Sequence, residues 1–196
     1  MVTPSSSAPA VFAGGSRDLK IVFTGSMGAG KTTAIQAISD GQALSTDVPI
    51  TGWSELPMPG KTMTTVGLDY GECQMDGGQW KLKLFGTPGQ ERFRFMWDIL
   101  GAGAFGLIVL ADNSQHDPIG EVARYLQAFA SHVPARRTVV GVGRLDTHPS
   151  PGIADYCEQL GALGYNPPVL EVDVRRDADV RLLLSVLVSM AEIEHE

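Results

Sequence analysis

The sequence predicts an α/β fold in which a mostly parallel six-stranded sheet carries helices on both faces. Short apolar runs alternate with stretches whose apolar residues recur at helical spacing, which is typical of this class. Most of the runs are nearly continuous, as strands buried on both faces require. A glycine-rich segment, residues 25–32, joins the first run to the first helical stretch.

Six apolar runs are expected to form the strands. They are residues 19–24, 65–75, 80–85, 105–111, 138–142 and 169–174. The sequence Asp76-Gly77-Gly78-Gln79 separates the second run from the third, and Asp-Gly between strand patterns predicts a hairpin. The 23 residues from 41 to 63 contain three prolines and three glycines without periodicity, so we expect a long, functional connection there.

Helices are expected at residues 31–40, after Gln90, and in three later segments that carry apolar stripes. The stripes begin at Val122, Ile153 and Val180, and we interpret all three as core faces rather than partner surfaces. Cys157 lies on the second stripe, which predicts a buried thiol. Neither cysteine has neighbours at metal-site spacing, so both are expected to be reduced.

Length and composition predict one domain of ordinary globular character. Of the 196 residues, 43% are hydrophobic and 19% are charged. Residues 1–17 are rich in serine, proline and alanine and are expected to be a disordered tail before a domain at 18–196. The net charge of −7, without a basic cluster, argues against nucleic acid and against electrostatic docking on a membrane.

We find no membrane-spanning segment or targeting signal in the sequence. No apolar run is long enough to span a bilayer, and no signal peptide or prenylation cysteine is present. We therefore expect a cytoplasmic protein without a direct membrane anchor, attached to membranes only through a partner.

The glycine-rich segment matches the phosphate-binding pattern Gly-x-x-x-x-Gly-Lys-Thr, which predicts a P-loop NTPase. Its residues are Gly25, Ser26, Met27, Gly28, Ala29, Gly30, Lys31 and Thr32, and Thr33 follows in the helix. Backbone amides of the loop and the helix dipole would cradle the phosphates. Lys31 would reach the β- and γ-phosphates, and the Thr32 hydroxyl would bind Mg²⁺. The alternative is a glycine-rich turn without a ligand.

Two further strings point to a family. Residues 84–93 have the sequence Leu-Phe-Gly-Thr-Pro-Gly-Gln-Glu-Arg-Phe, and residues 64–69 have Thr-Thr-Val-Gly-Leu-Asp. Together with the P-loop they resemble the Ras-like small GTPases, whose fold is the small G domain. The Gly-Gln-Glu-Arg-Phe string is similar to that of the Rab branch, and Thr-Pro-Gly-Gln to that of the prokaryotic branch that includes MglA. The resemblance runs from about Leu19 to Met190.

The resemblance implies roles around the γ-phosphate. Thr65, with Thr64 as the fallback, would bind Mg²⁺ beside Thr32. The Gly89 amide would contact the γ-phosphate, and Gln90 would orient the attacking water. Arg92 or Arg94 would offset transition-state charge, although solvated arginines and an arginine from a partner are the alternatives, as a solvated glutamine is for Gln90.

The resemblance also implies a guanine site, with departures from the family pattern. Asp146 occupies the position whose carboxylate accepts two hydrogen bonds from guanine. Arg144 replaces a lysine and is expected to stack over the base. Gly143 replaces an asparagine that braces the loop, and Gly86 replaces an aspartate that holds a water on Mg²⁺. The backbone amide of Val174 would complete the site. Asp146 as a simple turn cap is the rival interpretation.

The resulting hypothesis is a switch that binds GTP and GDP with Mg²⁺ and hydrolyses GTP slowly without an activator. The resemblance implies regulatory and effector partners, among them a Roadblock-type activator. Residues 41–64 and the helix after Gln90 would move, and Phe95 and Ile99 on that helix belong to a partner surface or to the core. A nucleotide-binding module without hydrolysis is the alternative. An ATPase or kinase is weaker, because the resemblance places Asp112 away from the metal.

Overall fold

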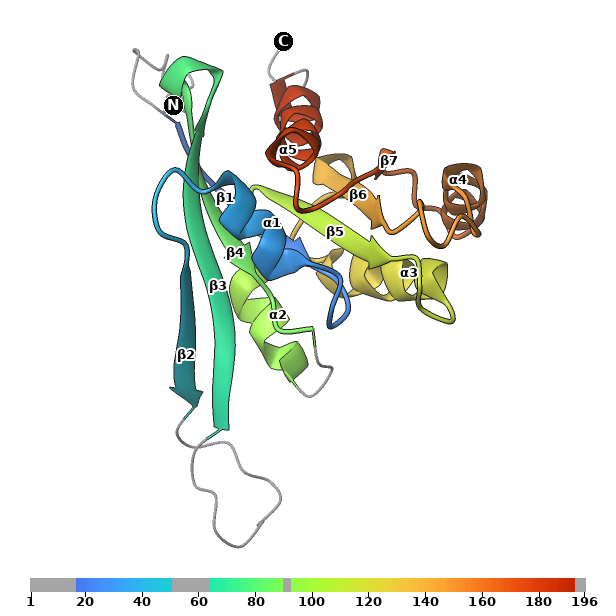
Figure 1. The fold of residues 1–196 in the computed structure, drawn as a ribbon, viewed down its shortest axis with the longest axis horizontal. Helices are drawn as coiled ribbons and strands as arrows, with labels where there is room; N and C mark the ends of the chain where they lie inside the picture. Colours follow the sequence, from blue (N-terminus) through green and yellow to red (C-terminus); the bar gives the residue numbers. More distant parts are fainter. Residues whose placement is uncertain (1–16, 51–63, 90–92, 193–196) are drawn as a thin grey trace, which may run out of the picture.

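The computed structural model describes residues 17–50, 64–89 and 93–192 of the chain. They form one sheet with helices on both faces, as the sequence predicts (Figure 1). The strands are β1 (Arg17–Thr24), β2 (Leu44–Ile50), β3 (Thr64–Met75), β4 (Trp80–Gly86), β5 (Gly106–Asp112), β6 (Thr138–Gly143) and β7 (Val169–Glu171). The helices are α1 (Lys31–Ile38), α2 (Arg94–Gly101), α3 (Pro118–Phe129), α4 (Ile153–Ala162) and α5 (Asp177–Glu192).

The strand order is β2-β3-β4-β1-β5-β6-β7. Strands β4, β1, β5, β6 and β7 run parallel to one another, whereas β3 is antiparallel to both β2 and β4. The predicted hairpin joins β3 to β4 through a short 3₁₀ turn, η1 (Asp76–Gly78). Parallel strands therefore end together beside the P-loop, at the edge of the sheet where ligands bind in such folds.

The fold class is confirmed, but the sheet has seven strands where six were expected. The additional strand is β2, which lies inside the connection predicted to be irregular. Pro49 hid it, because a strand interior disfavours proline. Strand β2 is at the edge of the sheet, where a missing N–H costs no ladder bond on the open side, and Pro49 pairs with Thr65 of β3. The remaining residues of that connection, 51–63, lie outside the described part.

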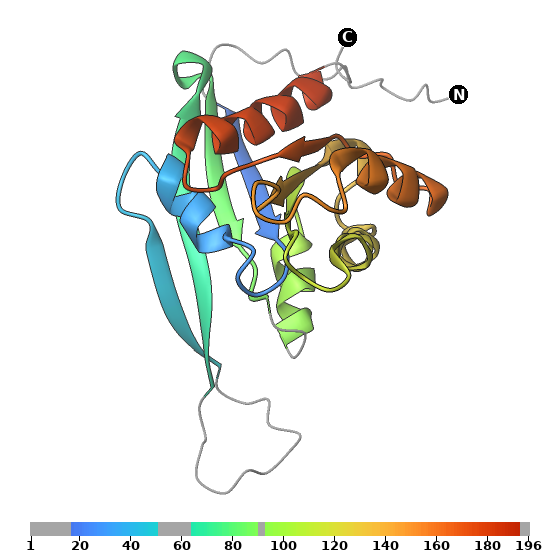
Figure 2. The same cartoon turned by 45° about the vertical axis from the view of Figure 1, so that its right-hand side comes forward.

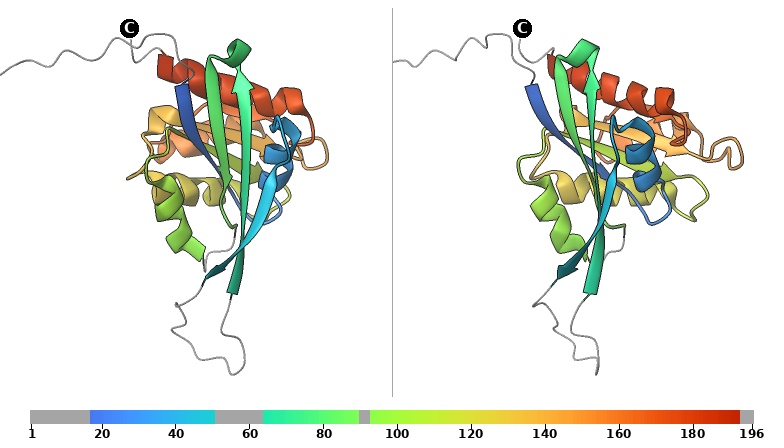
Figure 3. Two further views of the ribbon diagram at one scale, coloured as in Figure 1. Left: turned by 90° about the vertical axis from the view of Figure 1, so that its left-hand side faces the viewer. Right: turned by 60° about the vertical axis from the view of Figure 1, so that its left-hand side comes forward.

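Two apolar clusters hold the layers together, one on each face of the sheet. Helices α1 and α5 cover one face, and α2, α3 and α4 cover the other (Figures 2 and 3). Leu183, Leu184 and Leu187 of α5 are buried on the first face, and Val122 and Phe129 of α3 on the second. Tyr156 and Leu160 of α4 are also buried on the second face, so the three predicted stripes face the core with the exception of Cys157.

The prediction for Cys157 is wrong, since its side chain is exposed. Helix α4 buries Tyr156 and Leu160, which are four residues apart, and Cys157 lies one position around the helix from that face. Cys73 on β3 is buried, and burial raises the pKa of its thiol to about 11. Among the described residues, no helix combines the length and the apolar character needed to cross a bilayer.

Candidate functional site

The P-loop connects β1 to α1 and adopts a conformation that only glycine accommodates at its two ends. Gly25 and Gly30 have φ values of 140° and 93°. A Cβ on Gly25 would lie 2.2 Å from the Leu110 carbonyl oxygen, and one on Gly30 would lie 2.6 Å from a methyl group of Val174. The loop is therefore fixed against β5 and against the segment after β7 before any ligand binds. Gly30 also caps α1 without a side chain, which leaves the first-turn amides for an anion.

Lys31 is buried at the centre of this loop. Its ammonium donates to the carbonyl oxygens of Gly25 and Ser26, both at 2.7 Å. Burial lowers the pKa of Lys31 to about 8, against a smaller opposing effect of Asp69 and Glu121. A desolvated cation at a ring of backbone amides is suited to phosphate oxygens.

Thr32 contacts a carboxylate that the sequence did not single out. Its hydroxyl donates to Oδ2 of Asp69 at 2.6 Å, and Asp69 pairs across β3 and β4 with Gly86. A Cβ on Gly86 would lie 3.0 Å from both Cβ and Oδ2 of Asp69. The absence of a side chain at position 86 thus makes room for the Asp69 carboxylate. Asp69 lies on β3, whereas the aspartate of the family pattern would lie at position 86 on β4.

The segment after β4 runs directly over the P-loop. The Thr87 amide donates to the Phe23 carbonyl at 2.9 Å, and its hydroxyl donates to that of Thr24 at 2.9 Å. A Cβ on Gly89 would lie 2.6 Å from the amide nitrogen of Met27. Gly89 is thus close to the phosphate loop, as its predicted role requires. Gln90 and Arg92 lie outside the described residues, so their catalytic roles stay predictions.

Thr65 is not brought beside Thr32 in this structure. It lies in β3 opposite Pro49, four residues from Asp69, which corresponds to about 13 Å along a strand. Thr64, the fallback, lies still further along and pairs with Ile50. The structure therefore pairs Thr32 with Asp69, and ligation by Thr65 would require this hairpin to move.

A cleft of about 860 Å³ continues from the P-loop to the predicted base site. It is lined by residues from four separate parts of the chain. The predicted nucleotide-binding residues among them are Gly28, Ala29, Gly30, Thr33, Arg144, Asp146 and Val174. Residues predicted to bind phosphate and residues predicted to read the base therefore line one cavity, which is large enough for a nucleotide.

Arg144 connects the two ends of this cleft. One guanidinium nitrogen lies 2.7 Å from a carboxylate oxygen of Asp112 and donates to the Ser114 hydroxyl at 2.9 Å. The other donates to the Gly28 carbonyl at 3.2 Å. Arg144 was expected to stack over a base, and the structure adds a hydrogen bond from its side chain to the P-loop that the sequence did not predict.

Asp146 and Val174 both line the cleft. Oδ1 of Asp146 accepts from the Thr147 amide at 2.9 Å, as the turn-cap interpretation expects, while the residue is exposed at the cleft. Val174 packs on Gly30 and closes the cleft from the segment after β7. Cap and base reader are compatible roles, because a carboxylate has further acceptor positions.

Comparison with known proteins assigns the family. Residues 20–150, about two thirds of the chain, match the model of the Ras family. The chain belongs to the Ras family. The prediction of a Ras-like small G domain is thereby confirmed, whereas its prokaryotic MglA-like branch stays a prediction.

Relatives of this Ras-family chain include Ras-related proteins of plants and fungi. It is 24% identical to RAB1BV of Beta vulgaris, over 64% of this chain and 52% of that protein, and 25% identical to SEC4 of Candida albicans, over 68% and 65%. The chain thus spans between about half and two thirds of these relatives.

Solved structures with the same fold include two G domains. The Arl6 (BBS3) small GTPase of Trypanosoma brucei, with a bound nucleotide analogue, has a TM-score of 0.65 at 19% identity, covering 90% of this chain and 98% of that one. The G domain of the T. maritima FeoB iron transporter has a TM-score of 0.61 at 17% identity, covering 89% and 99%. At these identities the likeness establishes the fold alone.

Helix α2 of this Ras-family domain has two faces. Trp97 and Leu100 are buried, and the Trp97 indole donates to the Pro88 carbonyl at 3.2 Å. Phe95 and Ile99 are 38% and 61% exposed. The core alternative for these two side chains is therefore excluded in this structure, and the partner-surface alternative stays open.

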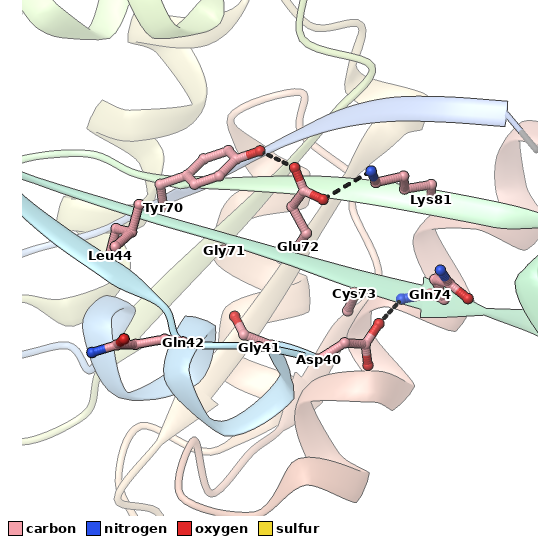
Figure 4. A pocket seen from close by; sticks show the side chains of 11 residues that line it. Asp40, Gly41, Gln42, Leu44, Tyr70, Gly71, Glu72, Cys73, Gln74 and Lys81 are labelled. Atoms are coloured by element: carbon pink, nitrogen blue, oxygen red, sulfur yellow. Dashed lines mark hydrogen bonds and ion pairs between the residues drawn. The ribbon is translucent and has the colours of Figure 1, made fainter.

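A second cavity, of about 360 Å³, lies at the outer edge of β3 (Figure 4). The Tyr70 hydroxyl donates to Glu72, whose carboxylate also pairs with Lys81 at 2.9 Å. On the other side, Oδ2 of Asp40 accepts a hydrogen bond from the backbone amide of Gln74 at 2.5 Å. These charged groups already bind neighbouring protein groups, so we assign the cavity no ligand.

Proposed function

We propose that this Ras-family protein is a guanine-nucleotide switch that binds GTP and GDP with Mg²⁺ and hydrolyses GTP slowly on its own. The observation that carries the proposal is the single cleft that joins the P-loop to Arg144, Asp146 and Val174. A guanine base at Asp146 would occupy one end of the cleft, and phosphates at Gly28 and Gly30 would occupy the other. Adenine lacks the two donors that a carboxylate at the base end accepts.

The oxygen donors beside the P-loop suit a magnesium ion. Thr32 and Asp69 provide a hydroxyl and a carboxylate, which are the hard ligands that Mg²⁺ prefers. The hydroxyl donates its proton to Asp69 and keeps its oxygen lone pairs for a cation. Thr32 would therefore bind the ion directly, and Asp69 would bind it directly or through a water. Bound Mg²⁺ neutralises charge on the β- and γ-phosphates.

Hydrolysis is proposed to depend on the segment after β4. Gly89 lies against the P-loop, and Gln90, the next residue of the chain, would orient the attacking water. Arg92, Arg94 or an arginine from a partner would offset the charge that develops. The Asp69 carboxylate would compensate for the aspartate absent at Gly86, and this favours the enzyme over the alternative, a binding module without hydrolysis.

We further propose that the protein belongs to the prokaryotic, MglA-like branch and acts in the cytoplasm. The Thr-Pro-Gly-Gln string supports this placement. Regulators and effectors would bind where Phe95 and Ile99 are exposed, and a Roadblock-type protein is the activator that this branch favours.

Product analysis tests the proposal against its alternative. The purified protein is loaded with radiolabelled GTP and Mg²⁺, and the bound nucleotide is extracted over several hours. We expect GTP to convert to bound GDP, and Lys31→Ala to bind neither. Retention of intact GTP, with candidate activators present, would establish the binding module instead.

A further inference from the structure

Two polar side chains at the end of β5, which belong neither to the P-loop nor to the Thr32–Asp69 pair, are almost fully buried. Asp112 and Asn113 are each 3% exposed. A buried carboxylate and a buried amide are costly unless their hydrogen bonds are satisfied. The partners of both therefore indicate what the two side chains hold in place.

Asp112 directs its carboxylate at Arg144. Besides that guanidinium at 2.7 Å, it accepts the Ser114 amide at 3.0 Å and the Ser114 hydroxyl at 2.6 Å. Burial raises the pKa of Asp112, but the Ser114 bonds, a bond from Gln115 and the Arg144 charge outweigh it, so the pKa lies below its ordinary value. The group is thus a fixed anion beside the base loop.

Arg144 has an unusual backbone that this anion helps to maintain. Its φ is 66°, and it is the single non-glycine residue with positive φ within residues 17–50, 64–89 and 93–192. Such a conformation is strained and persists only where its surroundings impose it. The same guanidinium reaches Gly28, so Asp112 indirectly connects the base loop to the phosphate loop.

Asn113 ties down the far side of the same loop. Its amide nitrogen donates to the carbonyl oxygens of His148 at 2.6 Å and Pro151 at 2.9 Å. Its amide oxygen accepts the hydroxyl of buried Tyr156 at 2.7 Å, and its backbone amide donates to Gly143 at 3.2 Å. Asn113 therefore holds the chain on both sides of Asp146.

We propose that Asp112 and Asn113 are positioning residues for guanine recognition, which together replace the loop-bracing side chain absent at Gly143. Asp112 acts through Arg144 and the P-loop, and Asn113 acts through the two carbonyl groups after Asp146. This inference rests on the proposed guanine specificity.

The test compares GDP with IDP, which lacks the 2-amino group that would donate a hydrogen bond to the Asp146 carboxylate. Affinities are measured by displacement of a fluorescent GDP analogue from the full chain. The wild type is expected to prefer GDP by roughly tenfold, the value of one charge-assisted hydrogen bond. A wild type without this preference contradicts the proposed guanine function itself, whatever the variants do.

Asp112→Asn removes the charge and keeps the shape. We expect the preference for GDP to fall to about twofold or less, because Asp146 is no longer held in place. Asp117→Asn is the matched control. Asp117 lies in the loop between β5 and α3 and caps α3 by accepting a hydrogen bond from the Gly120 amide at 2.9 Å, and asparagine caps a helix equally well. An unchanged preference in Asp112→Asn, or an equal loss in Asp117→Asn, overturns the proposal.

Asn113→Asp provides a second test, paired with Tyr156→Phe. The aspartate keeps an acceptor for Tyr156 and loses both bonds to the loop, whereas the phenylalanine loses only the Tyr156 bond. Thermal unfolding is expected to show destabilisation in both, and a reduced preference for GDP only in Asn113→Asp. If both variants are destabilised and both keep the preference, Asn113 has only a structural role. If Asn113→Asp does not fold, Asp112→Asn decides alone.

Discussion

Replacing Asp69 with asparagine removes the charge that accepts the Thr32 hydroxyl at 2.6 Å. A hydrogen bond to a charged group contributes about 1.5–3 kcal/mol. That range corresponds to roughly 10–100-fold in an equilibrium constant, which is also the usual effect of losing a group that orients a metal ligand. We therefore expect Asp69→Asn to weaken Mg²⁺ binding by about 10–100-fold while GDP still binds at saturating Mg²⁺.

The assay is release of a fluorescent GDP analogue at buffered concentrations of free Mg²⁺. The midpoint of Mg²⁺ dependence should rise by that factor in Asp69→Asn. Glu72→Gln is the matched control, because Glu72 lies on the same strand and binds Tyr70 and Lys81 instead. Equal midpoints in Asp69→Asn and the wild type would refute the assignment of this carboxylate to the metal.

A charge swap between the two strands sharpens the test. Gly86→Asp alone should be unfavourable, since its Cβ would lie 3.0 Å from Asp69 and 3.2 Å from Ile35. Combining it with Asp69→Gly relieves the contact with Asp69 and returns one carboxylate to the site from β4. The double variant should recover most of the lost Mg²⁺ affinity. A double variant as weak as Asp69→Gly would show that position 69 matters for another reason.

Three further predictions concern charge at the site and at the sheet edge. The pKa of Lys31 is lowered to about 8 from an ordinary 10.5. Between these pH values the unfolded chain binds more protons than the folded chain, so the free energy of unfolding of the nucleotide-free protein should increase as the pH rises through this window. Because phosphates favour the charged lysine, GDP binding should take up about half a proton at pH 8. Calorimetry in buffers of different ionisation enthalpy measures this uptake. No uptake would contradict the buried lysine. Asp146→Asn should shift preference from guanine toward xanthine nucleotides in a displacement titration, and no shift would exclude Asp146 as the base reader. Asp40→Ala should lower the free energy of unfolding by about 1 kcal/mol in urea, because the Gln74 amide at the edge of β3 loses its acceptor, whereas Asp40→Asn should retain most of it.

The periodicity of the sequence sufficed for most of the fold, since buried parallel strands and apolar helix stripes are local patterns. Strand β2 was missed because it contains a proline. A sheet tolerates proline at an edge, and whether a strand lies at an edge depends on its neighbours, which the local sequence does not show. Cys157 was misplaced because one residue around a helix separates a core position from an exposed one.

The proposed phosphate site could be predicted from a contiguous motif, whereas the Asp69 carboxylate beside it could not. Asp69 acts across a strand pair, and its role becomes visible only when the hairpin register is known. The signal was present, because Met75 pairs with Trp80, and counting six residues back along β3 and six forward along β4 places position 69 opposite Gly86. Asp112 and Asn113 carried no comparable signal, since the side chain and the two carbonyl groups that they are proposed to hold, in Arg144, His148 and Pro151, are 32 to 38 residues away along the chain.

Nucleotide displacement tests the central claim most directly. The protein is saturated with a fluorescent GDP analogue and Mg²⁺ and titrated with GDP, GTP and ATP. A guanine-nucleotide switch predicts displacement by GDP and GTP at similar concentrations and by ATP only at concentrations at least about a hundredfold higher, given the two hydrogen bonds at stake. Equal displacement by ATP would contradict the account.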